Sequence, residues 1–196
     1  MKEDIKKFWE NFLNPKTLRS NLIVASVFLS AFEILKECII ERPKEMHTNG
    51  FNEDGLVVNE KYKFDVLSLN KSPLYASLEW FRLRGVINQK DIDLFTEIKT
   101  CRNELAHQLP NFLTEGIKTD PIPNFKSIIE LLSKIEKWWV FNFEIALNPD
   151  LTEVEFDQND IIPGRLITLQ LLADIAMGSE EKSEYYYNEF VRKNAL

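Results

Sequence analysis

The sequence predicts an all-α protein. Only six of its 196 residues are glycine, and its apolar residues recur mostly at spacings of three and four, which is the periodicity of amphipathic helices. Apolar residues make up 44% and aromatic residues 12% of the chain, so it has enough material for a packed core. The length suits one domain with room for a small appended element.

The first half of the chain contains two predicted helices. One covers about residues 2–13, with Ile5, Trp9 and Phe12 on a single apolar face. Pro15 begins the second, which continues to about residue 41. Its apolar residues cover much of the circumference, which is typical of a helix central to a core or buried in a dimer.

Residues 43–70 form a predicted irregular insertion. Asn49-Gly50 and Asp54-Gly55 are turn signals, and residues 56–58 with 64–66 have the composition of a short hairpin. A connection of this length is usually functional or mobile.

Helical patterns resume in the second half. Ser72-Pro73 begins a helix that Gly85 ends, and Asn88 or Gln89 begins another that Pro110 stops soon after His107. Further helices are expected over about 124–147, 164–177 and 180–193. We therefore divide the chain into a helical domain, 1–147, and an acidic linker with a C-terminal helical extension of the same domain, 148–196. This tail is a lid, an oligomerisation arm or a packed extension.

Composition excludes several classes of function. Twenty-four basic and thirty-one acidic residues give a net charge of −7, which argues against broad neutralisation of duplex phosphates but allows a small basic cleft. Cys38 and Cys101 lack the spacing of a disulfide framework or zinc site and are expected to be buried free thiols. No metal and no cofactor are expected, because phosphate-loop and metalloprotease motifs are absent. No signal peptide or membrane span is expected, so a cytoplasmic protein is predicted.

One segment carries a chemically useful group of residues, near the end of the helix that begins at Asn88. Arg102 and His107 are five residues apart, and the long arginine side chain can lean toward the imidazole. Asn103 and His107 are four apart on one face. Arginine binds phosphate oxygens, and histidine transfers protons near neutral pH, so these residues suit a phosphodiester.

The spacing alone is weak evidence. Arg42 and His47 have the same spacing, although Pro43 is expected to prevent a helix from holding that pair together. A structural role for His107, in capping carbonyl groups at the helix end, remains an alternative.

The segment Arg102-Asn103-x-x-Ala106-His107 resembles the signature of HEPN-domain proteins, in which an arginine, a polar residue and a histidine occur late in a helix. The approach to it, from Pro73 through Gly85-Val86-Ile87, is also similar. The helix around Leu18-Arg19-Ser20 resembles the mannitol operon repressor group, which is HEPN-like. The resemblance covers about residues 15–147.

This resemblance implies an up-and-down helical bundle that forms a homodimer, with two motifs meeting in a cleft. It implies metal-independent RNA cleavage in which the 2′-hydroxyl is the nucleophile and a cyclic phosphate is left. Arg102 would stabilise phosphate charge, His107 would transfer a proton or orient the hydroxyl, and Asn103 would position either. Basic residues that would line the cleft are Lys99, Arg82 and Arg84, although each also suits an ordinary exposed position.

Many family members are toxins with an antitoxin partner or effectors of phage defence. Toxins paired with a nucleotidyltransferase antitoxin commonly have a tyrosine two residues after the histidine, where this chain has Leu109.

Two functions follow from these observations. The first is a homodimeric endoribonuclease. The second is a non-catalytic HEPN-like regulator or binding protein that acts through partners, similar to the mannitol repressor group. An intrachain ion pair that buries Arg102 against a carboxylate such as Glu33 would favour the second.

Overall fold

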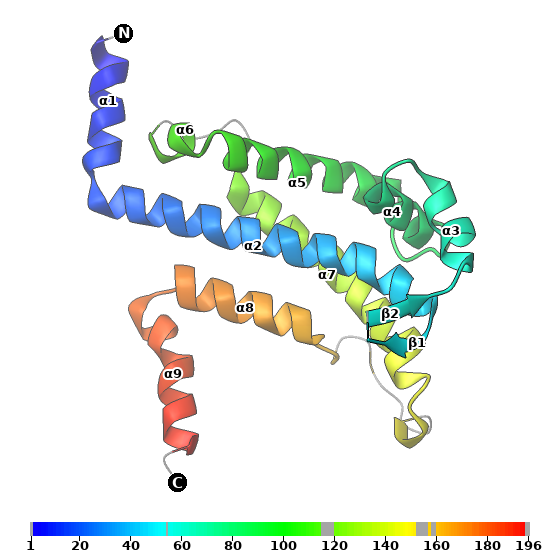
Figure 1. The fold of residues 1–196 in the computed structure, drawn as a ribbon. Helices are drawn as coiled ribbons and strands as arrows, with labels where there is room; N and C mark the ends of the chain where they lie inside the picture. Colours follow the sequence, from blue (N-terminus) through cyan, green and yellow to red (C-terminus); the bar gives the residue numbers. More distant parts are fainter. Residues whose placement is uncertain (1, 54, 115–119, 152–156, 158–159, 195–196) are drawn as a thin grey trace.

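The computed structural model describes residues 2–53, 55–114, 120–151, 157 and 160–194. Its central element is the long helix α2 (Pro15–Met46), which contacts α4 (Pro73–Leu83), α5 (Gln89–His107), α7 (Pro121–Trp139) and α8 (Gly164–Met177) (Figure 1). The all-α helical bundle predicted from the sequence is confirmed.

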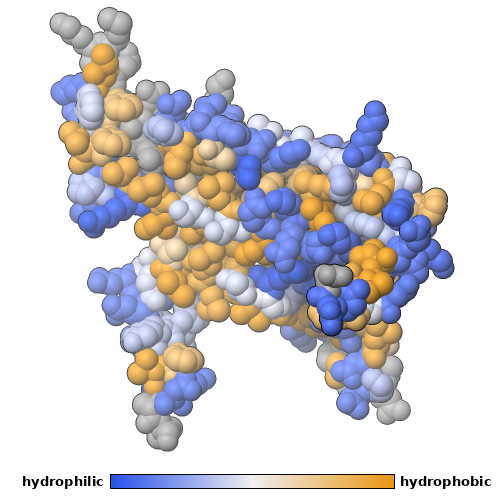
Figure 2. Space-filling view, viewed as in Figure 1, coloured by the Kyte–Doolittle hydropathy of each residue, from blue (hydrophilic) through white to orange (hydrophobic). Residues whose placement is uncertain are grey.

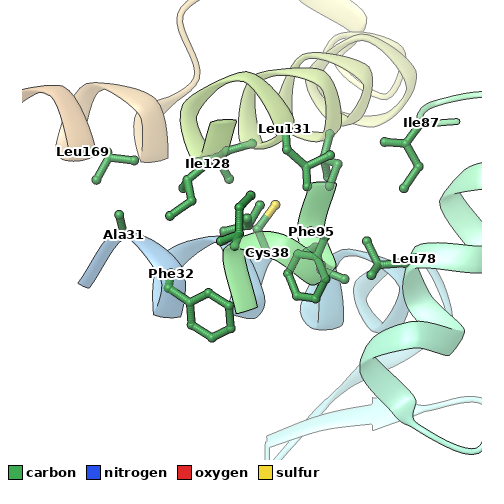
Figure 3. Packing of buried hydrophobic residues seen from close by; sticks show 14 of the residues in the cluster. Ala31, Phe32, Cys38, Leu78, Ile87, Phe95, Ile128, Leu131 and Leu169 are labelled. Carbon is green, nitrogen blue, oxygen red and sulfur yellow. The ribbon is translucent and has the colours of Figure 1, made fainter. Parts of the chain in front are cut away.

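The core lies where these helices meet around α2. Its largest fully buried side chains include Phe28, Trp80, Phe81 and Phe95. Leu169 of α8 joins the same cluster, so the first helix of the predicted extension is part of the core (Figure 3). Cys38 and Cys101 are buried and unbridged, as expected. Because α2 contributes apolar residues on several sides, four helices can bury their faces against it.

Helix α2 is longer than predicted. It continues through Pro43 to Met46, so the expectation that Pro43 would end the helix is wrong. Proline removes one backbone hydrogen bond from the helix. At this turn Arg42 anchors the chain instead, because it binds Glu136 on α7 and Glu45 on α2. His47 follows as the C-cap, with Nδ1 2.6 Å from the Pro43 carbonyl oxygen, so Arg42 and His47 are engaged separately.

The insertion contains a hairpin, but with different strands from those predicted. β1 (Thr48–Asn52) pairs antiparallel with β2 (Gly55–Val58). The predicted second strand, 64–66, lies instead in α3 (Lys61–Asp65) and the turn that follows it, before η1 (Leu67–Leu69). Tyr62 and Val66 are both buried, and their spacing of four residues is the helical signal that the hairpin interpretation missed.

The junction between α4 and α5 follows the sequence closely. Gly85 has a φ of +71°, the left-handed conformation expected after a helix end. Asn88 caps α5 by accepting hydrogen bonds from the backbone N–H groups of Lys90 and Asp91, while the Asp91 carboxylate accepts from the Asn88 N–H. These reciprocal bonds fix where the motif-bearing helix begins.

After α5 the chain departs from the prediction. α5 ends at His107 as expected, but a short helix, α6 (Leu109–Thr114), follows at once. Pro110 lies in its first turn, where a missing N–H breaks no helical bond. α7 begins at Pro121, three residues before the predicted start, because Asp120 accepts a hydrogen bond from the Ile122 N–H. It continues into a π-helical segment, η2 (Val140–Ile145).

Two helices project from the same end of the body (Figure 1). α1 (Lys2–Leu13) contacts α2 and α6, and α9 (Glu180–Asn194) contacts α8. The predicted acidic linker includes η3 (Pro149–Leu151), while residues 152–156, 158 and 159 of that linker lie outside the described residues.

Candidate functional site

The predicted motif lies on the C-terminal half of α5. Ile98, Cys101 and Leu105 are buried and hold this half against the core. Asn103 and His107 are exposed, and Arg102 is half-buried at the edge between α5 and α2. The helix therefore presents all three motif residues at the surface.

Arg102 points across to α2. Its Nη2 donates to Oε1 of Glu33 at 3.1 Å, and its Nη1 lies 3.4 Å from Oδ1 of Asn103. The guanidinium carbon is 5.5 Å from the centroid of the Phe32 ring. Nε is buried without a hydrogen-bond partner. Glu33 thus holds the guanidinium through one nitrogen only, and the side chain remains 33% exposed with donors to spare.

The expectation that Arg102 leans toward His107 is wrong. The Glu33 carboxylate and the Phe32 ring on the neighbouring helix attract the guanidinium away from the end of α5. The capping alternative for His107 is not observed either, since within the described residues its imidazole makes no side-chain hydrogen bond to a carbonyl group. Gln108 is the C-cap of α5, and its backbone N–H donates to the Glu104 carbonyl oxygen. His107 is exposed to solvent.

The Glu33 carboxylate is shared by two cations. Lys36 also forms an ion pair with Glu33. A hydrogen bond from Lys36, and after it one from Arg102, lowers the pKa of the Glu33 carboxyl group despite its partial burial. Because two cations share one carboxylate, the Arg102 guanidinium keeps N–H donors that an anion can accept from, although the whole chain is acidic.

Of the three further basic residues, only Lys99 lies near the motif. It is one helical turn before Arg102, with Nζ 4.9 Å from the centroid of the Tyr75 ring. Arg82 binds Glu79, and the guanidinium carbon of Arg84 lies 3.7 Å from the centroid of the Trp80 ring. Both belong to the end of α4, beside the first turn of α5 and roughly 20 Å along that helix from Arg102. The structure therefore does not gather these arginines with Lys99 around the motif.

A buried charged cluster escaped the sequence analysis. Glu136 of α7 is 2% exposed and accepts hydrogen bonds from Arg42, Arg165 and the Cys38 thiol, with distances from 2.9 to 3.0 Å. The sequence does contain a sign of this cluster: Glu136 comes four residues after Leu132, so it lies on the apolar face of the helix. Because these partners come from α2 and α8, the cluster joins three helices.

Comparison with known proteins adds no relative: the chain matches no family model, and no curated protein or solved structure is significantly similar to it. The resemblance to HEPN proteins thus rests on the residues quoted above. In the described part of the chain, no helix is both long and apolar enough to cross a membrane, and no three potential metal-ligating side chains gather in one place.

Proposed function

We propose that the protein is a HEPN-type, metal-independent endoribonuclease that acts as a homodimer. The observation that carries this proposal is the placement of the Arg102 guanidinium, which Glu33 holds at the surface beside Asn103, on the same helix as an exposed His107. A phosphodiester needs a cation that binds its oxygens and a group that moves a proton, and these residues supply both.

In the proposed reaction, the RNA 2′-hydroxyl attacks the adjacent phosphorus atom and the bond to the 5′-oxygen breaks. The products are a 2′,3′-cyclic phosphate and a 5′-hydroxyl end. Arg102 stabilises the charge on the phosphate oxygens, Asn103 orients the phosphate, and His107 either accepts the proton of the 2′-hydroxyl or donates one to the leaving oxygen. Because Arg102 turns away from His107 within one copy, we expect the complete site to need residues of two copies.

A role as a toxin or phage-defence effector in the cytoplasm fits this activity. Leu109 occupies the place of the tyrosine that marks toxins with a nucleotidyltransferase antitoxin. We therefore expect any antitoxin to act by binding the protein rather than by modifying a tyrosine there.

The test is cleavage of mixed RNA by the purified protein in EDTA. We expect R102A and H107A each to lower the rate by at least about 100-fold, with cyclic phosphate ends on the wild-type products. Arg84→Ala is the matched control, since it removes an exposed arginine far from the motif and should leave the rate unchanged. Cleavage that survives both motif substitutions would contradict the proposal.

A second candidate is a non-catalytic HEPN-like regulator or binding protein. The ion pair between Arg102 and Glu33 favours it, because that pair gives Arg102 a structural partner. The sequence-based criterion for this candidate is an ion pair that buries Arg102 against a carboxylate. The pair with Glu33 is present, but it is partly exposed. A well-folded dimeric wild type that cuts no RNA would select this candidate.

A further inference from the structure

We propose that helix α9 of one copy docks into an apolar groove of a second copy, and that the exchange is reciprocal. The groove lies between α2, α7 and the end of α8, and its apolar lining includes Ile23, Val27, Phe28, Phe125, Ala176 and Met177. The arm is α9. This proposal does not rest on the proposed ribonuclease activity.

The groove is large and mostly apolar. It encloses about 540 Å³, and Lys16 and Ser20 are the polar side chains that line it. A second hollow of about 250 Å³ between α2 and α8 shares Ile23, Val27 and Ala176 with it. Hydrophobic surface covers this part of α2 and α8 in Figure 2. Exposed apolar surface of this kind typically marks an interaction site.

Helix α8 supports the same conclusion. Its sequence is apolar on nearly every side, which is typical of a buried helix. Leu169 faces the core, but Ile167 and Ile175 are about half-exposed. The outer side of α8 therefore lacks a partner among the residues that the structure describes.

The arm carries a matching apolar stripe. Phe190 and Val191 lie three and four residues after Tyr187, so the three side chains share one face, and their exposed fractions are 70% for Tyr187, 67% for Phe190 and 44% for Val191. α9 has 15 residues and packs on α8. A helix of that length is marginal in water without tertiary contacts, so burial of the stripe would stabilise it.

The arm cannot be the occupant of its own groove. A Cβ atom at Gly178 would lie 2.2 Å from the Asp174 carbonyl oxygen, so the turn between α8 and α9 is very tight. Across this turn the Asp174 carboxylate accepts a hydrogen bond from the Tyr186 hydroxyl at 2.9 Å and forms an ion pair with Lys182 at 2.8 Å. These contacts direct α9 away from α2 (Figure 1).

A second copy meets the requirements of both surfaces. Under two-fold symmetry each arm can cover the other copy's groove, so both unpartnered surfaces are buried twice. Each arm would place its exposed Tyr187 and Phe190 against the apolar lining of the other copy's groove. Charge also agrees: the arm begins with exposed Glu180, Glu181 and Glu184, while exposed Lys16 and Arg19 flank the groove at the start of α2.

The first test is the mass of the full-length protein in solution, by light scattering and sedimentation equilibrium. We expect wild type to be a dimer of 23.0 kDa chains. Phe190→Glu on the arm and Ile23→Glu in the groove should each weaken dimerisation at least about tenfold. Phe64→Glu is the matched control, because Phe64 is equally exposed, at 73%, but lies in the insertion. Circular dichroism checks folding, and Met177→Glu replaces Ile23→Glu if that variant unfolds.

Mixing the two variants tests the arm-to-groove contact itself. A heterodimer of F190E with I23E keeps one intact arm facing one intact groove. We expect the mixture to form heterodimers more tightly than either variant forms homodimers.

A wild type that stays monomeric at tens of micromolar, a dimer unaffected by both substitutions, or a mixture without heterodimers would overturn the proposal. RNA cleavage is measured separately with R102A and H107A, which leave the arm and groove intact. A wild type that dimerises through arm and groove but cuts no RNA would contradict only the ribonuclease proposal. Cleavage that depends on Arg102 and His107, in a dimer that F190E and I23E do not weaken, would contradict only the docking proposal.

Discussion

Arg102 and Glu136 illustrate two kinds of charged residue in this protein. The ion pair of Arg102 with Glu33 is partly exposed at both ends, with fractions of 33% and 46%. Such pairs contribute about 0–1 kcal/mol to stability. We therefore expect R102A to remain folded, so that its effect on RNA cleavage reports on chemistry.

Glu136 is different because it is buried among its partners. Burial raises the pKa of its carboxyl group, but hydrogen bonds from Arg42, Cys38 and Arg165 outweigh that effect and lower the pKa overall. Burial raises the pKa of the Cys38 thiol, and Glu136 adds to that effect, so the thiol stays protonated and donates its hydrogen bond. The carboxylate is the buried counter-charge that Arg42 and Arg165 share, and their other carboxylate partners, Glu45 and Glu37, are more exposed.

We predict that Glu136→Gln lowers the free energy of unfolding by about 3 kcal/mol, because it leaves Arg42 and Arg165 without a buried counter-charge. Urea denaturation measures the change. Glu130→Gln on the same helix is the control, since Glu130 forms an exposed pair with Lys126 and should change stability by less than about 0.5 kcal/mol.

The pH dependence of this effect has a definite sign. The pKa of Glu136 is lower in the folded than in the unfolded state, so its contribution is complete above the ordinary carboxyl pKa and is lost as pH falls through the lowered value. The difference in stability between wild type and E136Q should therefore shrink in acid. A difference that grows below pH ~4 would contradict this account.

Among the helices, α5 matters most because it carries the motif. Its start depends on Asn88, whose side chain accepts hydrogen bonds from two backbone N–H groups. We predict that Asn88→Ala lowers the free energy of unfolding by about 1 kcal/mol, as measured by denaturation. Asn88→Ser should lose much less, because serine caps helices nearly as well, and an equal loss in both variants would argue against the capping role.

Sequence patterns predicted helices well where local signals and burial agreed. The cap at Asn88 and the left-handed Gly85 both lie where the sequence placed them. The errors arose where tertiary contacts outweighed a local signal. Pro43 is a helix breaker, yet α2 passes through it while Arg42 binds a residue 94 positions away. Local rules carry no information about such a partner.

At the scale of the whole molecule, the sequence located the motif but not the direction of Arg102. Spacing along one helix placed Arg102, Asn103 and His107 together, and all three do lie at the surface of α5. The guanidinium turns to Glu33 because α2 packs beside α5, which only the assembled fold determines. The projecting helices likewise follow from packing angles that apolar periodicity does not encode.

The overall charge of −7 bears on how the protein would bind RNA. Near the motif, each copy offers Arg102 and Lys99 as cations for phosphate, so a dimer offers about four contacts. For single-stranded RNA the slope of log affinity against log salt is then about −3, at −0.7 per contact. We predict that affinity falls roughly 50-fold between 50 and 200 mM salt. Fluorescence anisotropy with a labelled oligoribonucleotide measures it, in the H107A variant so that the RNA stays intact.

The matched control for this titration is Lys99→Ala in the same background. Removing one contact per copy should reduce the slope by about 1.4, whereas Arg84→Ala should not change it. A slope near zero would mean that the motif does not bind phosphate. A slope steeper than about −6 would require more cations than surround Arg102 and would place the RNA on another surface.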